Sequence, residues 1–303
     1  MSKNIPSTVH YHVTVNPNTH ALNVEIHMAG PVVTGEQLLL TVPTWVPGHY
    51  NFMPLAHNIS SITAINNTTG SELKVTREGW QGYRIHAPND DITIRYVAYA
   101  FAPEFGEPSD ILDSHYAVLL GTRYLYSQQH LGNCFVTYHL PKAWNNKIHH
   151  PLGAERIAKT TWQYPSHKIL LDTPIVIGNF DSYKRSINNT PIHFVFIDSS
   201  VSYQQKVAGF VDELVKIVEF FYHRYGAFPF QDYTFVMSLN PKIDWGLEHL
   251  TSTMCGLAPD VFTNPEQYQQ GIRVCAHKMF HTWNVRRLRP PPFVKAGKTG
   301  TFH

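Results

Sequence analysis

Hydrophobic and polar residues alternate along several short segments in roughly the first 185 residues of the chain. The clearest alternations cover residues 11–15, 22–28, 92–99 and 134–140. A period of two places every second side chain on the same face of a strand, so each segment is predicted to be a β-strand with one buried face. Clusters of Asn, Pro, Asp and Gly separate these segments. Many short strands joined by such turns favour a sandwich or an open, curved sheet.

The pattern changes near residue 200, where apolar residues recur at steps of three and four. The stripe consists of Val207, Phe210, Val211, Leu214, Ile217, Val218 and Phe221. This spacing predicts a helix from about Tyr203 to Tyr225, with Ser202 as its N-cap and Gly226 just beyond its end. Without a complete partner surface, a stripe of this kind would be an exposed apolar patch.

A strand over residues 234–239 and a second helix are expected further along the chain. Asn264 is the expected N-cap of this helix and Pro265 its first residue, and the helix is expected to run to about Asn284. The fold class is therefore α+β, with an N-terminal all-β, sandwich-like domain at residues 1–188 and a mixed domain at residues 189–303.

Composition and charge exclude several classes of protein. Hydrophobic residues make up 43% of the 303 residues, enough for packed cores, and 24 Lys and Arg against 22 Asp and Glu give a net charge of +2. A chain so close to neutral is not expected to bind nucleic acid. No apolar run reaches the roughly 18–20 residues of a membrane span, and the first residues lack the apolar core of a secretory signal. Three cysteines fit a reducing cytosol, so we expect a cytoplasmic protein.

Two histidines four residues apart, His277 and His281, lie in the second expected helix. Residues at this spacing share a helix face, so both imidazoles can approach one metal ion, as in half of a zinc site. The chain has 19 histidines, and about one such pair is expected by chance. The alternative interpretation is two histidines on a partly buried helix.

A second motif, Gly246-Leu247-Glu248-His249, follows the expected strand at 234–239. A carboxylate beside a zinc cleft is what an aminopeptidase needs to hold the free α-amine of its substrate. The alternative interpretation of Glu248 is a solvated carboxylate on an edge strand.

Together these motifs resemble the glycyl aminopeptidase family of zinc metallopeptidases, whose members carry a PDZ domain. The family's helix motif is His-Glu-x-x-His-x-Trp-Asn-Val-Lys-Arg-x-Arg-Pro, and this chain matches it at His277, His281, Trp283, Asn284, Val285, Arg287, Arg289 and Pro290. Gly246–His249 is similar to the family's Gly-Leu-Glu-His. Trp45–Tyr50 resembles its Trp-x-Pro-Gly-x-Tyr, and Asp172–Phe180 resembles the segment that closes its N-terminal domain.

The resemblance implies an N-terminal β domain followed by a thermolysin-like catalytic domain and a PDZ domain. It implies zinc-dependent release of N-terminal residues from peptides, with small residues such as Gly and Ala favoured. His277 and His281 would be the zinc ligands, and Glu248 with Gly246 would bind the substrate.

Lys278 departs from this pattern, because it occupies the position of the family's general-base Glu. At about 5 Å and an effective dielectric near 20, its ammonium and a zinc dication repel by ~6–7 kcal/mol. That repulsion is expected to weaken zinc binding, lower the Lys pKa or turn the side chain away. The family's third ligand is a Glu on a later helix, and no acidic residue follows Glu266 here.

From these departures we expect a truncated family member that is catalytically impaired or inactive, with zinc bound weakly or not at all. An active zinc aminopeptidase, a non-catalytic peptide-binding module and a decayed fragment remain the competing functional hypotheses. In the second, the strand edge near Gly246–Glu248 would pair with an extended peptide.

Overall fold

The computed structural model describes residues 8–30, 37–44, 53–86, 91–101, 110–127, 132–144, 147–197, 204–243 and 245–288. The motif Trp45–Tyr50, the expected cap Ser202, and Arg289 with Pro290 lie outside the described residues. The fold is α+β, as the sequence predicts, and it is mostly β.

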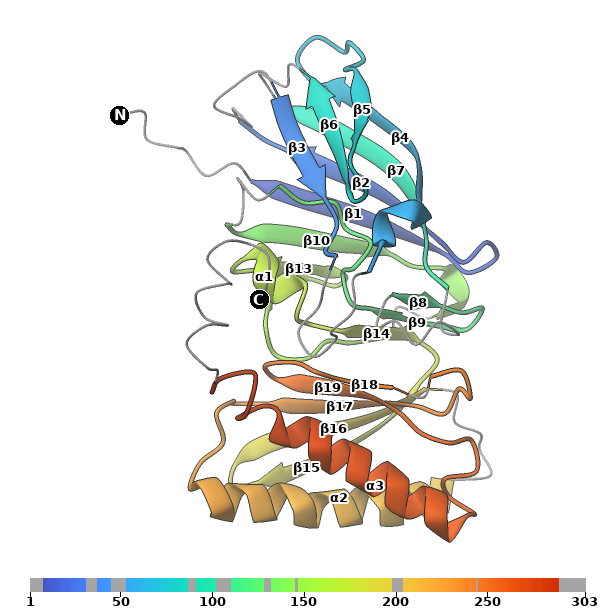
Figure 1. Ribbon diagram of the computed structural model, residues 1–303, viewed down its shortest axis with the longest axis vertical. Helices are drawn as coiled ribbons and strands as arrows, with labels where there is room; N and C mark the ends of the chain where they lie inside the picture. Colours follow the sequence, from blue (N-terminus) through green and yellow to red (C-terminus); the bar gives the residue numbers. More distant parts are fainter. Residues whose placement is uncertain are drawn as a thin grey trace.

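A seven-stranded sheet forms the largest layer of the N-terminal half (Figure 1). Its strand order is β12 (Glu155–Ala158), β13 (Thr161–Tyr164), β10 (Cys134–His139), β1 (Val9–Asn16), β2 (Ala21–Met28), β7 (Ile92–Tyr99) and β4 (Ile59–Asn66). The four segments with clear alternation all lie in this sheet, as β1, β2, β7 and β10. Their alternate side chains are buried, which confirms the period-two interpretation.

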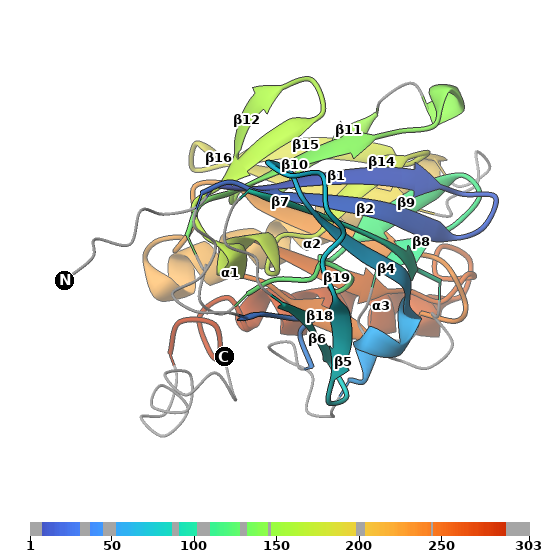
Figure 2. The same ribbon diagram turned by 90° about the horizontal axis from the view of Figure 1, so that it is seen from above.

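Two smaller sheets complete the N-terminal half. One contains β3 (Gln37–Thr41), β6 (Gly82–His86) and β5 (Val75–Glu78), and the other β11 (Ile148–His149), β14 (Ile175–Gly178), β9 (Tyr116–Leu119) and β8 (Ile111–Leu112). The described helices in this half are short, namely η1 (Leu55–Asn58), η3 (Lys142–Trp144) and α1 (His167–Leu170). Figure 2 shows the β5–β6 hairpin on the opposite side of the molecule from β12.

A five-stranded sheet forms the core of the C-terminal half. Its order is β15 (Asp181–Ile187), β16 (Thr190–Ile197), β17 (Tyr233–Ser238), β19 (Ser252–Gly256) and β18 (Gly246–Glu248), with β18 at one edge. The helices α2 (Gln204–Tyr225) and α3 (Pro265–Phe280) cover one face, and the β8–β9–β14 side of the molecule covers the other (Figure 1). On β17, Phe235 packs in the cluster with the helices and Val236 in the cluster with β9 and β14. Both faces of the sheet are therefore buried at β17.

The division of the chain at residue 188 stays a prediction. Asn188 and Asn189 form the turn between β15 and β16, with positive φ angles of 50° and 63°. Both strands belong to the five-stranded sheet, so the sheets change earlier, between Gly178 and Asp181.

The two long helices match their sequence patterns except at one end. The side chains of the α2 stripe are buried, apart from the partly buried Ile217, so this stripe has a partner surface within the described residues. Asn264 caps α3 by accepting hydrogen bonds from the amides of Glu266 and Gln267. However, α3 ends at Phe280 rather than near Asn284. The amides of Thr282 and Trp283 bond to carbonyls three residues back, so the last turn tightens before the chain leaves the helix. None of the helices in the described ranges has the length and apolar character needed to cross a membrane.

Replacing Phe210 by Ala should strongly destabilise the C-terminal half. Phe210 lies on α2, is fully buried, and contacts the rings of Phe196, Phe262 and Tyr268. Truncation of a core Phe removes apolar contacts and leaves a cavity, at a cost of about 3–5 kcal/mol. Chemical denaturation followed by circular dichroism measures this loss.

The matched control is Phe220→Ala on the same helix, because the side chain of Phe220 is 62% exposed. We expect this variant to change the free energy of unfolding by less than about 0.5 kcal/mol. Equal destabilisation by the two variants would contradict the described packing of α2.

Candidate metal and substrate site

The predicted histidine pair lies at the C-terminal end of α3. His277 is in the last turn and His281 is the C-cap, and their Nε2 atoms are 2.8 Å apart. His281 Nδ1 lies 3.1 Å from the carbonyl oxygen of Asn284. Because a carbonyl only accepts, Nδ1 carries the proton and donates, which leaves the lone pair of Nε2 on the side that faces His277. Such a hydrogen bond is typical of the contacts that orient metal-binding histidines.

The protonation state of His277 also suits a ligand. Burial lowers the pKa of His277, and the neighbouring His281 and Lys278 lower it further. The neutral imidazole, which is the form that binds a metal, is therefore favoured at neutral pH.

The pair fits two positions of a zinc site. Two nitrogens at 2.0–2.1 Å from a tetrahedral ion lie about 3.3 Å apart, so a small rotation of either ring would accommodate the ion. Within the described ranges, no group of three His, Cys, Asp or Glu side chains is placed to hold a metal. Two histidines are fewer than the three protein ligands that catalytic zinc normally has.

Lys278 and Glu248 form a buried ion pair beside the histidines. Lys278 Nζ donates to Glu248 Oε2 at 3.1 Å, and the two side chains are 12% and 2% exposed. Glu248 does lie on an edge strand, but the alternative interpretation of a solvated carboxylate is wrong because the side chain is buried. The pair joins positions 30 residues apart, so no local sequence pattern predicts it.

The period of β18 explains why Glu248 faces α3. Leu247 points to the opposite face of the strand and packs into the core cluster of the N-terminal half. Gly246 and Glu248, two residues apart, therefore share the other face. A Cβ atom at Gly246 would lie 2.8 Å from Lys278 Cε and 3.0 Å from its Cγ. A larger residue at this position would require the aliphatic part of Lys278 to shift.

The ion pair determines what this site can do chemically. Lys278 Nζ donates its hydrogen bond to Glu248, so this nitrogen is placed as a donor rather than as an acceptor of a proton from water. A side chain placed in this way is poorly suited to act as a general base. The negative charge of Glu248 also offsets the positive charge of Lys278, which reduces the repulsion expected between Lys278 and a metal on the histidine pair.

A second buried cluster ties the end of β18 to the N-terminal half. Asp172 accepts from the guanidinium of Arg286, from His249 Nδ1 at 3.3 Å and from the amide of Leu250 at 2.9 Å. Burial alone would raise the pKa of Asp172, but Arg286, His249 and the Leu250 amide together lower it below its ordinary value. The carboxylate is thus held ionised, and it joins three segments of the chain.

The arginines after α3 hold this part of the chain together. Arg286 pairs with Asp172 from the N-terminal half, and Arg287 donates to backbone carbonyls of Leu250, Thr282 and Pro229. The sequence does indicate where Asp172 lies, because it is the first residue of the segment that resembles the end of the family's N-terminal domain.

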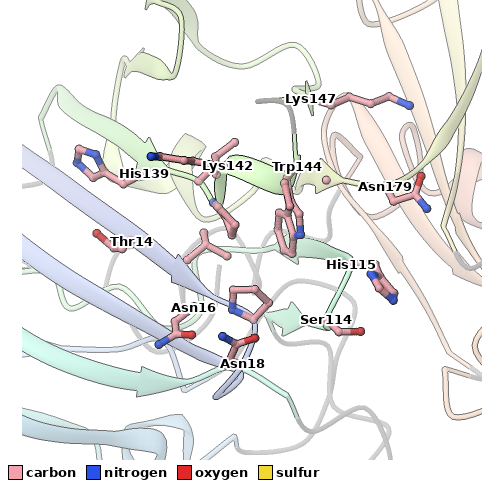
Figure 3. A pocket seen from close by; sticks show the side chains of 16 residues that line it. Thr14, Asn16, Asn18, Ser114, His115, His139, Lys142, Trp144, Lys147 and Asn179 are labelled. Atoms are coloured by element: carbon pink, nitrogen blue, oxygen red, sulfur yellow. The ribbon is translucent and has the colours of Figure 1, made fainter.

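A groove lies elsewhere, between the β1–β2 turn, η3 and the end of β14 (Figure 3). Its volume is about 910 Å³, and Trp144, His115, Lys142 and Asn179 are among its lining residues. No acidic side chain occurs among the described lining residues. The groove shares no residue with the histidine pair or the Lys278–Glu248 ion pair.

Comparisons with known proteins gave one family match and a match to a solved structure. Residues 10–179 match the family model of the peptidase M61 N-terminal domain. The fold is similar to the crystal structure of an aminopeptidase N family protein from Idiomarina loihiensis, with a TM-score of 0.82 and 22% sequence identity. The match covers 94% of this chain and 49% of that chain, so this chain spans about half the length of that structure. A search of curated proteins gave no match.

Replacing Asp172 by Asn should destabilise the protein by about 3–5 kcal/mol at neutral pH, because it leaves Arg286, whose side chain is 4% exposed, without its carboxylate. The folded-state pKa of Asp172 is lowered, so its contribution is fully present above its ordinary value of 3.8 and is lost as pH falls through the folded-state pKa. Urea denaturation of the unaltered chain and of Asp172→Asn should be measured as a function of pH. The difference between their free energies of unfolding should become smaller in acid.

Asp212→Asn is the control for this experiment. Asp212 pairs with Arg185 at 2.9 Å, but its side chain is 62% exposed. The change should cost at most about 1 kcal/mol at any pH. If the stability lost in Asp172→Asn did not depend on pH, the charge of the carboxylate would not be what stabilises this cluster.

Proposed function

This chain belongs to the M61 peptidase family, and from that premise we propose that it is a catalytically impaired relative of the zinc-dependent aminopeptidases. The observation that carries the proposal is the hydrogen bond of 3.1 Å between Lys278 and Glu248. By the resemblance, Lys278 takes the position of the general base, and an amine that donates to a carboxylate is poorly suited to accept a proton from water. The ancestral substrates would be peptides with small N-terminal residues such as Gly and Ala.

The metal proposed for this site is zinc, bound weakly. His277 and His281 would hold the ion through their Nε2 atoms, with His281 oriented by Asn284. When bound, zinc polarises a carbonyl and lowers the pKa of a coordinated water. Lys278 does not supply the general base that this chemistry also needs, because its ammonium group is hydrogen-bonded to Glu248.

We propose that the chain can still bind peptides, although it does not hydrolyse them. The strand β18 is at the edge of the five-stranded sheet, and it pairs with β19 on one side only. An extended peptide can add to such an edge through backbone hydrogen bonds. Since Leu247 anchors β18 in the N-terminal core, the edge is held rigidly without needing a ligand.

Zinc titration of the metal-free chain tests the metal part of the proposal. We expect binding that weakens at least ~10-fold in His281→Ala, because one of two protein ligands is removed. His223→Ala on α2 is the control and should leave the affinity unchanged. Equal affinities in all three proteins would rule out the histidine pair as the metal site.

Aminopeptidase assays test the catalytic part. With chromogenic substrates that carry an N-terminal Gly or Ala and with added zinc, we expect the chromophore to be released no faster than without protein. Lys278→Glu should be assayed beside the unaltered chain, because it supplies a carboxylate at the base position. Hydrolysis by the unaltered chain that a chelator abolishes would contradict the proposal.

A further inference from the structure

The walls of the groove between the β1–β2 turn, η3 and the end of β14 are joined by backbone hydrogen bonds. The amide of Asn179 donates to the carbonyl of His115 at 2.8 Å, and the amide of Gly178 donates to the carbonyl of Lys147 at 3.0 Å. The amide of Lys147 donates in turn to the carbonyl of Trp144 at 3.1 Å. Segments far apart in the sequence thus fix the shape of the groove before any ligand binds, as is usual for small-molecule sites.

Gly178 allows these walls to come together. Its φ angle is 92°, in the region that favours glycine, and a Cβ atom there would lie 2.5 Å from the carbonyl oxygen of His115. The same Cβ atom would be 2.9 Å from Cε3 of Trp144. The ring of Trp144 is 8% exposed, so it packs as part of the wall.

The groove is basic on two sides. Lys142, Lys147, His115 and His139 line it, and no described lining residue is acidic. Figure 3 shows Lys142 and His139 on one side of Trp144, and Lys147 and His115 on the other. Positive groups separated in this way suit an elongated anion that carries more than one charge.

Several of these polar groups are available to a ligand. The side chains of Lys142, His115 and Asn179 are exposed and form no hydrogen bond or ion pair with the described part of the chain. Lys147 Nζ donates to the carbonyl of Phe180 and lies 4.1 Å from the centroid of its ring, which fixes its position. An ammonium group has three hydrogens, so Lys147 can donate to a ligand as well.

The carboxylates that come nearest along the chain do not line the groove. Asp113 accepts hydrogen bonds from the amide and the hydroxyl of its neighbour Ser114. Asp181, two residues after Asn179, is also absent from the described lining. The positive charges of the groove therefore have no acidic counterpart among its described lining residues.

We propose that this groove binds an anion that carries two or more phosphate groups. Lysine binds phosphate as a point charge, and no described lining residue is an arginine, whose planar fork would grip a carboxylate through two hydrogen bonds. Asn16, Asn18 and Asn179 add amide donors for further phosphate oxygens. The proposal is independent of the proposed function, because the groove shares no residue with the histidine pair or the Lys278–Glu248 ion pair.

Isothermal titration calorimetry with sodium tripolyphosphate tests this proposal. The protein and the buffer must be free of metal, because tripolyphosphate itself binds divalent cations. We expect saturable binding at a single site, and added NaCl should weaken it because salt screens exposed charges. Lys142→Gln should weaken binding about 5-fold, since one solvent-exposed charge contact is lost. Lys142→Arg, which keeps the charge, should retain most of the affinity.

Asn179→Asp tests the opposite wall without changing the size of the side chain. It should weaken binding at least as much, because a carboxylate then faces the anion. Asn189→Asp is its matched control, in the exposed turn between β15 and β16, where Asp tolerates the φ angle of 63°. Lys216→Gln is the control for Lys142→Gln, because it removes a 69% exposed lysine from α2. Both controls should bind like the unaltered chain, and circular dichroism should show every variant folded.

Two results would overturn the proposal. One is the absence of saturable binding by the unaltered chain. The other is equal affinity in Lys142→Gln, Asn179→Asp and both controls, since the attraction would then come from the overall charge of the chain.

The source of the phosphate groups is a soluble ester or a lipid headgroup, and co-sedimentation separates the two. Vesicles of phosphatidylcholine with phosphatidylinositol bisphosphate are compared with vesicles of phosphatidylcholine alone. Sedimentation with the first kind that Lys142→Gln reduces supports the groove as a headgroup site. Tripolyphosphate binding without sedimentation supports it as a site for a soluble phosphate ester.

Discussion

The ammonium of Lys278 and the carboxylate of Glu248 meet where neither is well solvated, and the candidate site depends on that contact. Removing two charges from water is expensive, and the cost is recovered only if each charge remains paired with the other. The contact therefore holds the side chain of Lys278 in one place over Gly246. It also leaves the histidine pair of α3 beside a neutral pair rather than beside an isolated cation.

The position of β18 depends on the N-terminal half as much as on its own sheet. Leu247 packs into the N-terminal core, and Asp172 receives hydrogen bonds from Leu250 and Arg286 just beyond the strand and the helix. One buried carboxylate thus connects the ends of the two elements that carry the site. This arrangement gives the N-terminal domain a direct part in the geometry of the candidate site.

Local patterns in the sequence were sufficient for the strands, for α2 and for the histidine pair. Alternation and helical spacing act between neighbouring residues, so β1, β2, β7 and β10 and the stripe on α2 could be predicted. The contacts between distant segments could not be, because they depend on how the sheets pack. Lys278 with Glu248, Gly246 beneath Lys278, and Arg286 with Asp172 are contacts of this kind. The end of α3 at Phe280 was likewise not predicted, because it results from the tightened turn that follows Phe280.

A double-mutant cycle on Lys278 and Glu248 tests the central claim most directly. Free energies of unfolding are measured for the unaltered chain, Lys278→Met, Glu248→Gln and the double variant in the absence of metal. The account predicts that each single change is strongly destabilising and that the double variant recovers much of the loss, with a coupling energy of about 2–3 kcal/mol. Additive effects within about 0.5 kcal/mol would contradict a buried ion pair between these residues.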